Sequence, residues 1–216
     1  LFIDAAMMKL TSRVVIETLL GADIGVRMDS IQQYIYFLQD HMVKLIRTPF
    51  YNYLAKINGK ENQFNAALKA FDEILFTIIN ERKTQPSRND LLSMLMDARD
   101  EDTGEGMRDR QLRDELLTIY VAGHETSGYT LAWAMYNLCS YPEVYKKAKE
   151  ALHRVMPDGK SSIENYKDLV YLKQVIDETL RLYPTAYLLS RESKYPDEVK
   201  GLEIPADTVT LMSTYF

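Results

Sequence analysis

Residues 122–127 read Ala-Gly-His-Glu-Thr-Ser, in the middle of a segment whose periodicity is otherwise that of one long helix. A glycine in a helix interior costs roughly 0.8 to 1 kcal/mol relative to alanine, so Gly123 needs a structural reason. One reason is a flat ligand lying against the helix. The other is a crossing of two helices at small residues. The six residues alone do not separate these two interpretations.

The acid and the alcohol of this stretch, Glu125 and Thr126, form a candidate proton relay. The hydroxyl of Thr126 can donate to the carbonyl of Ala122 one turn earlier, a bond that bends a helix and opens a local groove for water or a diatomic ligand. Glu125 adds a titratable proton source beside that groove. A zinc-protease motif is excluded, because the second histidine of His-Glu-x-x-His would fall on Gly128.

The composition is that of a globular protein, with 46% hydrophobic and 26% charged residues. A net charge of -5 argues against a nucleic-acid-binding surface. Cys139 has no second cysteine to pair with, and the histidines show no metal-ligand spacing, since His41 and His153 lie on charged helices where we expect them in solvent. Because no stretch approaches the ~20 apolar residues of a membrane span, we expect a soluble, cytoplasmic protein with no anchor in this chain.

Helical periodicity predicts a mainly α fold, one domain over residues 1–216, with a small β-hairpin region at the C-terminal end. The longest helix is predicted for residues 109–140, a length of about 48 Å. Further helices are predicted for residues 7–21, 31–46, 61–83, 90–98, 142–156 and 166–183. Beyond Pro184, β-branched residues and the turn formers Gly201 and Pro205 predict short strands and a hairpin over residues 187–213.

A second motif, Glu-Thr-Leu-Arg-Leu-Tyr-Pro at residues 178–184, places Glu178 and Arg181 on one helix face. Glu105 and Arg108 have the same spacing in a polar, glycine-containing loop, so spacing alone means little. The apolar neighbours of Glu178 and Arg181 predict that this pair is substantially buried. Such a pair is costly to desolvate, which indicates a specific structural role.

Ala122–Ser127 followed by Glu178–Pro184 resembles the central part of a cytochrome P450. That family has an acid–threonine pair in a long central helix over the haem, and a Glu-x-x-Arg motif in a later helix that stabilises the core. The resemblance covers residues 109–216 clearly and the earlier part more weakly. It implies a P450-like helical core and a haem-dependent monooxygenase.

The resemblance also implies roles for individual residues. Glu125 and Thr126 would deliver protons during oxygen activation, and Ala122 and Gly123 would leave room over the haem face. Arg191 would bind a haem propionate, a role that suits its fixed fork of donors.

Tyr187, Leu188 and Leu189 would line the substrate pocket, and their apolar character indicates a hydrophobic organic substrate. The cofactor implied for the full-length parent is haem b. Its partners would be O2 and an electron donor, either a reductase or a protein of the ferredoxin or flavodoxin type, supplied by NAD(P)H.

The family holds its iron with a cysteine thiolate, in a loop of the form Phe-x-x-Gly-x-Arg-x-Cys-x-Gly. Cys139 is not that ligand, because it lies in Asn-Leu-Cys-Ser-Tyr-Pro, where a buried free cysteine is the ordinary explanation. The chain begins at Leu1 and ends in a strand-like run at Phe216, so we expect an internal fragment that is inactive alone. Two alternatives stay open: a haem-less helical binding or scaffold relative, and a membrane-anchored parent.

Overall fold

The structure is a computed structural model that describes residues 2–21, 28–160 and 162–215. The chain divides into two compact units: unit 1 consists of Leu1–Met8 with Thr126–Phe216, and unit 2 of Lys9–Glu125. The single domain expected for residues 1–216 stays a prediction. The architecture is mainly α with two small antiparallel sheets near the C-terminal end, as expected.

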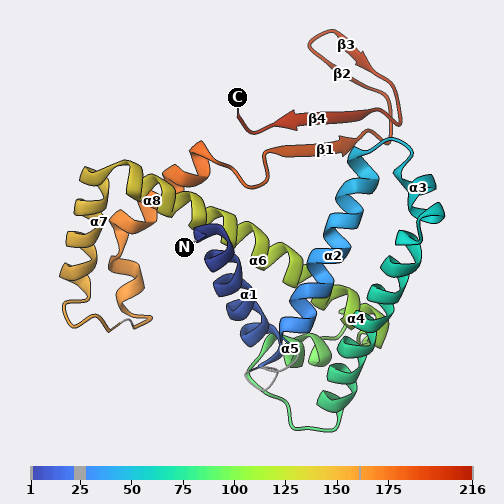
Figure 1. The fold of residues 1–216 in the computed structure, drawn as a ribbon, viewed down its shortest axis with the longest axis horizontal. Coiled ribbons are helices and arrows are strands. Elements are labelled where there is room, and N and C mark those ends of the chain that lie inside the picture. Colours follow the sequence, from blue (N-terminus) through green and yellow to red (C-terminus); the bar gives the residue numbers. More distant parts are fainter. Residues whose placement is uncertain (1, 22–27, 161, 216) are drawn as a thin grey trace. The chain divides into compact units, whose positions relative to one another are not determined.

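Unit 2 contains most of helix α1 (Ile3–Leu20) and the first half of α6 (Asp109–Ser140). Between them come α2 (Met28–Arg47), α3 (Tyr51–Ile57), α4 (Lys60–Lys83) and α5 (Leu91–Asp97). Helix α4 packs against both α2 and α3 (Figure 1). Its residues Phe71, Leu75, Ile78 and Ile79 are all buried.

The core of unit 2 is a cluster of apolar side chains from α1, α2, α4, α5 and α6. It comprises Ile16, Leu19, Leu20, Ile35, Phe71, Leu75, Ile78, Ile79, Leu92, Leu112, Leu116 and Tyr120. Every one of these side chains is at most 5% exposed, so their burial is the main stabilising term of this unit.

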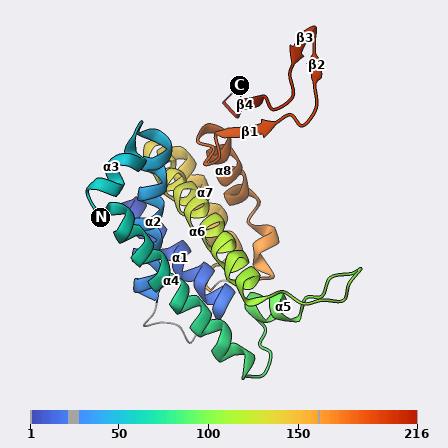
Figure 2. The ribbon, with the colours of Figure 1, turned by 90° about the vertical axis from the view of Figure 1, so that its right-hand side faces the viewer.

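Several helix boundaries follow local signals that the sequence carries. Gly21 ends α1 with a φ of 77°, and its amide donates to the Glu17 carbonyl. Asp90 caps α5 by accepting a hydrogen bond from the Ser93 amide. Helix α6 runs without interruption over the predicted residues 109–140 (Figure 2).

Unit 1 contains the second half of α6, then α7 (Pro142–Val155), a 3-10 turn (Asn165–Asp168) and α8 (Val170–Leu182). The single helix predicted for residues 166–183 is therefore wrong in its first turn. Leu169 separates the 3-10 turn from α8 because its backbone, at φ −79° and ψ 42°, leaves the helical region.

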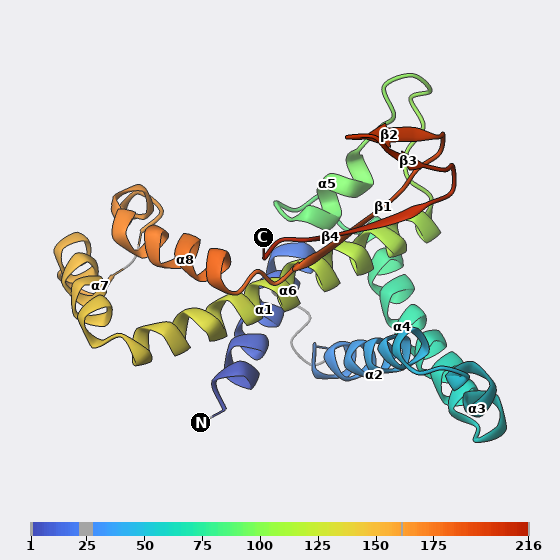
Figure 3. The same ribbon diagram turned by 90° about the horizontal axis from the view of Figure 1, so that it is seen from above.

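Two strand pairs follow α8 in unit 1. Strand β1 (Leu188–Glu192) pairs with β4 (Val209–Ser213), with Arg191 opposite Thr210. Strands β2 (Asp197–Val199) and β3 (Leu202–Ile204) form the predicted hairpin (Figure 3). All residues of β1, β2 and β4 are exposed, so neither pair encloses a core of its own in this chain.

Candidate functional site

His124 is the most deeply buried residue of the 122–127 stretch, at 0% exposure. Its Nδ1 lies 2.9 Å from the Tyr120 carbonyl, and because a carbonyl only accepts, Nδ1 carries the proton. The imidazole stacks on the Tyr120 ring and meets the Tyr36 ring edge-on. Its Nε2 has no hydrogen-bond partner among the described residues. His124 thus faces the interior of unit 2.

Helix α1 contacts this turn of α6 through two adjacent hydroxyls. Thr11 Oγ1 donates to the backbone carbonyl of His124 at 2.8 Å. Ser12 Oγ lies 2.7 Å from the Tyr120 hydroxyl. Burial raises the pKa of Tyr120 above its ordinary value of 10.0, and the Ser12 hydrogen bond opposes that change only in part. The polar groups of α1 therefore hold α6 at both Tyr120 and His124.

Gly123 owes its identity to the same helix pair. A Cβ at this position would lie 3.3 Å from Cγ2 of Val15 in α1, closer than ordinary van der Waals contact. The helix-crossing interpretation therefore accounts for this glycine. Ala122, by contrast, is exposed. Haem contact by Ala122 and Gly123 stays a prediction.

Glu125 is half-buried, and its carboxylate is held by another helix of unit 2. Gln39 Nε2 of α2 donates to Glu125 Oε2 at 2.8 Å. The sequence gives no signal of this partner, because the contact joins side chains 86 positions apart. The predicted acid is thus fixed in one orientation by a neutral donor.

Thr126 follows Glu125 in the same helix and is exposed. Two other threonines of α6 donate to the carbonyl one turn earlier: Thr118 to Asp114, and Thr130 to Thr126, both at 2.8 Å. This helix therefore uses the bond type predicted for Thr126. The specific bond from Thr126 to Ala122 stays a prediction.

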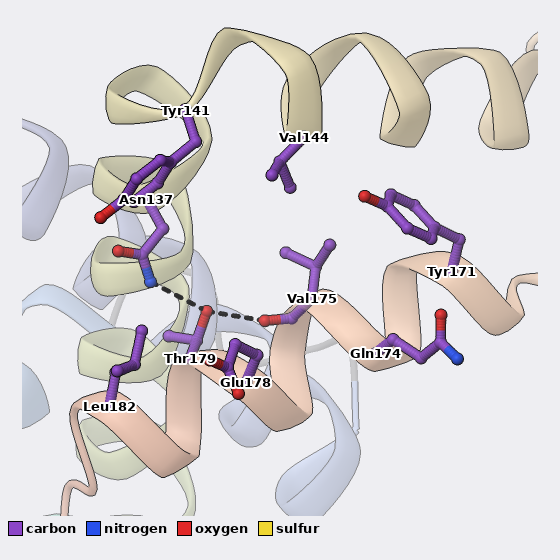
Figure 4. A pocket seen from close by; sticks show the side chains of 9 residues that line it. All are labelled: Asn137, Tyr141, Val144, Tyr171, Gln174, Val175, Glu178, Thr179 and Leu182. Atoms are coloured by element: carbon purple, nitrogen blue, oxygen red, sulfur yellow. Dashed lines mark hydrogen bonds between the residues drawn. The ribbon is translucent and has the colours of Figure 1, made fainter.

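A pocket of 460 Å³ in unit 1 was not predicted from the sequence. Residues from α8 and from the α6–α7 junction line it (Figure 4). Asn137 Nδ2 donates to Thr179 Oγ1 at 3.3 Å, and Thr179 in turn donates to the Val175 carbonyl at 2.8 Å. Asn137 Oδ1 is buried without a partner among the described residues. The wall is otherwise mostly apolar.

Glu178 and Arg181 do pair, but the expected burial is wrong. Arg181 Nε and Nη2 donate to the two carboxylate oxygens at 2.7 and 2.6 Å. The Arg181 and Glu178 side chains are nevertheless 67% and 55% exposed. The hydrogen bond from Arg181 lowers the pKa of Glu178, and the same contact raises the pKa of Arg181. A role for this pair in stabilising the core stays a prediction.

Arg191, Tyr187, Leu188 and Leu189 lie on or just before β1, and all four are exposed. Arg191 Nη1 donates to the neighbouring Ser190 carbonyl at 2.8 Å. A smaller cavity of 200 Å³ is lined by Tyr187 and by aromatic residues of α6 and of the segment after α8. Its members are Tyr129, Trp133, Tyr183, Pro184, Thr185, Tyr187 and Tyr215.

Within that aromatic group, Trp133 stacks face to face on Tyr183. The two ring centroids lie 4.1 Å apart with an interplanar angle of 3°. Tyr183 directly precedes the proline that follows α8, so the stack holds the end of α8 against α6 within unit 1. Tyr187 is the one predicted pocket residue that lines this cavity.

Two expectations about single side chains are wrong. Cys139, in the last turn of α6, is exposed rather than buried. His41 is 5% exposed and stacks on Phe64, whereas His153 is exposed as expected. The described residues contain no group of three or more His, Cys, Asp or Glu side chains placed to hold a metal ion.

A long helix that carries an acid–threonine pair, a later Glu-x-x-Arg helix and a following strand region are thus arranged in the order that the resemblance implied. The family model that describes cytochrome P450 matches residues 3–216. The chain belongs to the cytochrome P450 family. With 216 residues, almost the whole chain takes part in this match.

Relatives of this P450 chain include a bifunctional cytochrome P450/NADPH–P450 reductase of Bacillus subtilis, 39% identical over 145 residues. That alignment covers 66% of this chain and 14% of the relative. Cyclooctat-9-en-7-ol 5-monooxygenase of Streptomyces melanosporofaciens is 33% identical over 157 residues, which cover 72% of this chain and 34% of the relative.

The crystal structure of the cytochrome P450DA heme domain has the same fold, with a TM-score of 0.88 and 22% sequence identity. It matches 99% of this chain, and the match covers 47% of that chain. The P450 chain described here therefore spans less than half of that heme domain and a smaller share of the curated relatives.

The described residues fit one side of a haem but supply no ligand set for its iron. Ala122 and Thr126 are exposed one turn apart on α6, and a small residue at 122 leaves space for a planar ring system. The iron ligand has no candidate here, because Cys139 lies 13 residues beyond Thr126 at the far end of α6 and no metal cluster is formed by the described residues. Haem binding against this face of α6 stays a prediction.

Proposed function

We propose that the protein to which this chain belongs is a haem-dependent monooxygenase that inserts one oxygen atom of O2 into a hydrophobic organic substrate. Haem b, when bound, supplies the redox chemistry that activates oxygen. Family membership supports this proposal, and the observation that carries it is the oriented Glu125 carboxylate directly before Thr126. This chain alone, without a thiolate ligand, is inactive in this proposal.

Glu125 and Thr126 move protons to the reacting oxygen in this proposal. Gln39 holds one carboxylate oxygen of Glu125, which leaves the other oxygen of the carboxyl group to exchange a proton. The Thr126 hydroxyl, on the exposed face of α6, passes a proton on as a neutral donor and acceptor. An acid and an alcohol in sequence give the transfer one direction.

The substrate pocket is formed in part by Tyr187, Leu188 and Leu189, whose exposed apolar side chains favour a hydrophobic substrate. Ala122 and Gly123 lie along the haem face, and Arg191 binds a propionate. Its Nη1 donates to the Ser190 carbonyl, and a guanidinium has five N–H donors in all.

Electrons come from NAD(P)H through a partner protein. Several relatives are named as fusions of cytochrome P450 with NADPH–P450 reductase, which favours a reductase over a ferredoxin-type donor. Every helix among the described residues is too short or too polar to traverse a bilayer. We propose a cytoplasmic location.

The proposed function is tested in the full-length protein with the variants Thr126→Ala and Thr126→Ser. Thr126→Ala removes the hydroxyl, so product formed per NAD(P)H consumed falls by about tenfold or more while hydrogen peroxide rises. Thr126→Ser keeps the hydroxyl and stays near the wild-type ratio. An unchanged ratio in Thr126→Ala removes Thr126 from the mechanism.

The haem-less alternative predicts a different result for the full-length protein. A scaffold relative binds no haem at full length and shows no haem absorption after reconstitution. Stoichiometric haem with a thiolate-type spectrum rejects that alternative.

A further inference from the structure

Thr11 lies outside both motifs, in α1, yet its side chain reaches the backbone of α6. The residue is 6% exposed, and its Oγ1 donates to the carbonyl oxygen of His124 at 2.8 Å. In an α-helix that carbonyl already accepts from the amide four residues later, which belongs to Gly128. The hydroxyl of α1 therefore competes with a backbone hydrogen bond of α6.

The helical turn closed by that backbone bond contains Glu125, Thr126 and Ser127. A side chain that inserts into the ladder of helix hydrogen bonds is an established cause of local bending. The Thr11 hydroxyl and the Gly128 amide therefore compete for a carbonyl in the turn that carries Glu125 and Thr126. The neighbouring contact of α1, from Ser12 to the Tyr120 hydroxyl, joins side chains only and leaves the ladder intact.

Neighbouring contacts of α6 hold the Thr11–His124 hydrogen bond in one orientation. The His124 side chain is buried and bonded to Tyr120, so the residue cannot rotate away from α1. A Cβ at position 123 would lie 3.3 Å from Val15 Cγ2, so the glycine permits the close approach of the two helices at this level. On the α2 side, Gln39 holds the Glu125 carboxylate.

We propose that Thr11 is a positioning residue for the proton-delivery pair: its hydroxyl draws the His124 carbonyl outward and opens the α6 turn that carries Glu125 and Thr126. The inference rests on the proposed function, since it assigns Thr11 a part in the same proton transfer. Thr11 acts on the pair through the His124 carbonyl.

The first test measures amide hydrogen exchange of α6 in the full-length protein. Thr11→Val keeps the side-chain volume but removes the hydroxyl, which returns the His124 carbonyl to the Gly128 amide. Exchange at Gly128 then slows by roughly fivefold relative to the flanking amides. If Thr11 only stabilised the fold, Thr11→Val would destabilise the protein and Gly128 exchange would become faster instead of slower. Thr11→Ser keeps the hydroxyl and stays at the wild-type rate.

Two matched controls lie in the same helix. Ser12→Ala removes the buried side-chain contact next to Thr11 and lowers stability, but it does not slow exchange at Gly128. Thr18→Val makes the same substitution at an exposed residue whose hydroxyl bonds to its own helix, at the Val14 carbonyl. It changes neither stability at the α1–α6 contact nor Gly128 exchange.

The second test measures product formed per NAD(P)H consumed. Thr11→Val lowers this ratio by roughly threefold or more through misplacement of the pair, and Thr11→Ser restores it. Thr126→Ala is measured alongside. If Thr126→Ala keeps the wild-type ratio, the proposed function fails. If Thr126→Ala uncouples but Thr11→Val does not, or if Gly128 exchange does not slow, the positioning role of Thr11 is overturned.

A poorly folding Thr11→Val protein does not block the test. In the wild-type protein, competition for the His124 carbonyl makes the Gly128 amide exchange faster than the amides of Ser127 and Tyr129. Equal rates at the three positions overturn the inference without any variant.

Discussion

Arg82 is a cation almost fully removed from solvent, with 6% of its side chain exposed in unit 2. Its Nη1 donates to Asp90 Oδ2 at 2.5 Å and to Ser93 Oγ at 3.0 Å, and its Nη2 donates to the Leu20 carbonyl at 2.7 Å. These bonds join the ends of α1 and α4 to the start of α5. Gly21 fits beside them because a Cβ there would meet Asp90 and Arg82 at 3.1 and 3.4 Å.

Asp90→Asn removes the charge that compensates Arg82 and leaves the guanidinium buried and unpaired. Breaking such a pair costs about 3 to 5 kcal/mol of unfolding free energy. Urea unfolding followed by circular dichroism measures the loss. Glu178→Gln is the matched control, since that pair is exposed, and its unfolding midpoint shifts far less. Equal shifts in the two variants would contradict the assignment of burial.

Stability at low pH depends on the same carboxylate. Burial alone raises the pKa of Asp90, but hydrogen bonds from Ser93 and Arg82 outweigh it, so the pKa lies below its ordinary value of 3.8. A lowered pKa means that the stabilisation is complete above 3.8 and is lost as the pH falls through the folded-state value.

The wild-type protein therefore loses unfolding free energy more steeply than Asp90→Asn as the pH falls from about 5 to about 2. The difference between the two proteins, measured by urea unfolding at each pH, shrinks toward acid. A difference that stays constant with pH would exclude Asp90 as the titrating group.

The sequence was informative about residue types at the site and uninformative about their partners. It predicted an acid–threonine pair, and it predicted that Gly123 marks a close approach. Val15, Gln39 and Thr11 supply the actual contacts, and each lies on another helix. Such contacts depend on tertiary packing, which a periodic pattern along one helix does not encode.

Helix α6 shows at the level of elements why some boundaries could be predicted. Tyr141-Pro142 ends it and starts α7, since proline is favoured in a first helical turn. The break at Leu169 carries no proline or glycine, so the sequence predicts one helix across the two segments on either side of it. Local chemistry thus fixed the first boundary, and backbone geometry without a sequence signal fixed the second.

The crossing of α1 and α6 at Gly123 is tested by a double-mutant cycle with Val15. Gly123→Ala gains helix propensity of roughly 0.8 to 1 kcal/mol but crowds Val15 Cγ2. In a Val15→Ala background the crowding is relieved, so Gly123→Ala stabilises the protein more there than in the wild type. The coupling free energy is about 0.5 kcal/mol or more. Additive effects in thermal unfolding would mean that the two residues do not meet.

At the scale of the whole molecule, the two units differ in what stabilises them. Unit 2 has the apolar core from five helices, whereas every residue of the paired strands β1 and β4 of unit 1 is exposed. A two-stranded sheet without a covered face is marginally stable in water. The 216-residue chain therefore loses its structure region by region rather than in one cooperative step.

Hydrogen exchange of the 216-residue chain, followed by mass spectrometry, tests this difference. Amides of β1–β4 exchange about a hundredfold faster than the amides of those α4 residues whose side chains lie in the core of unit 2. Peptides from α7, which is helical but lies outside the unit 2 core, serve as an internal reference. Uniform protection across the chain would show that the strands are stabilised as strongly as the core.

Trp133 is the single tryptophan of the chain, and its ring is parallel to that of Tyr183. Two aromatic chromophores at 4.1 Å couple their electronic transitions, so the pair should give an exciton band in near-ultraviolet circular dichroism. Tryptophan emission then reports selectively on one junction, where the end of α8 meets α6. The protein thus carries a built-in optical probe of unit 1, and unit 2 contributes no tryptophan signal to it.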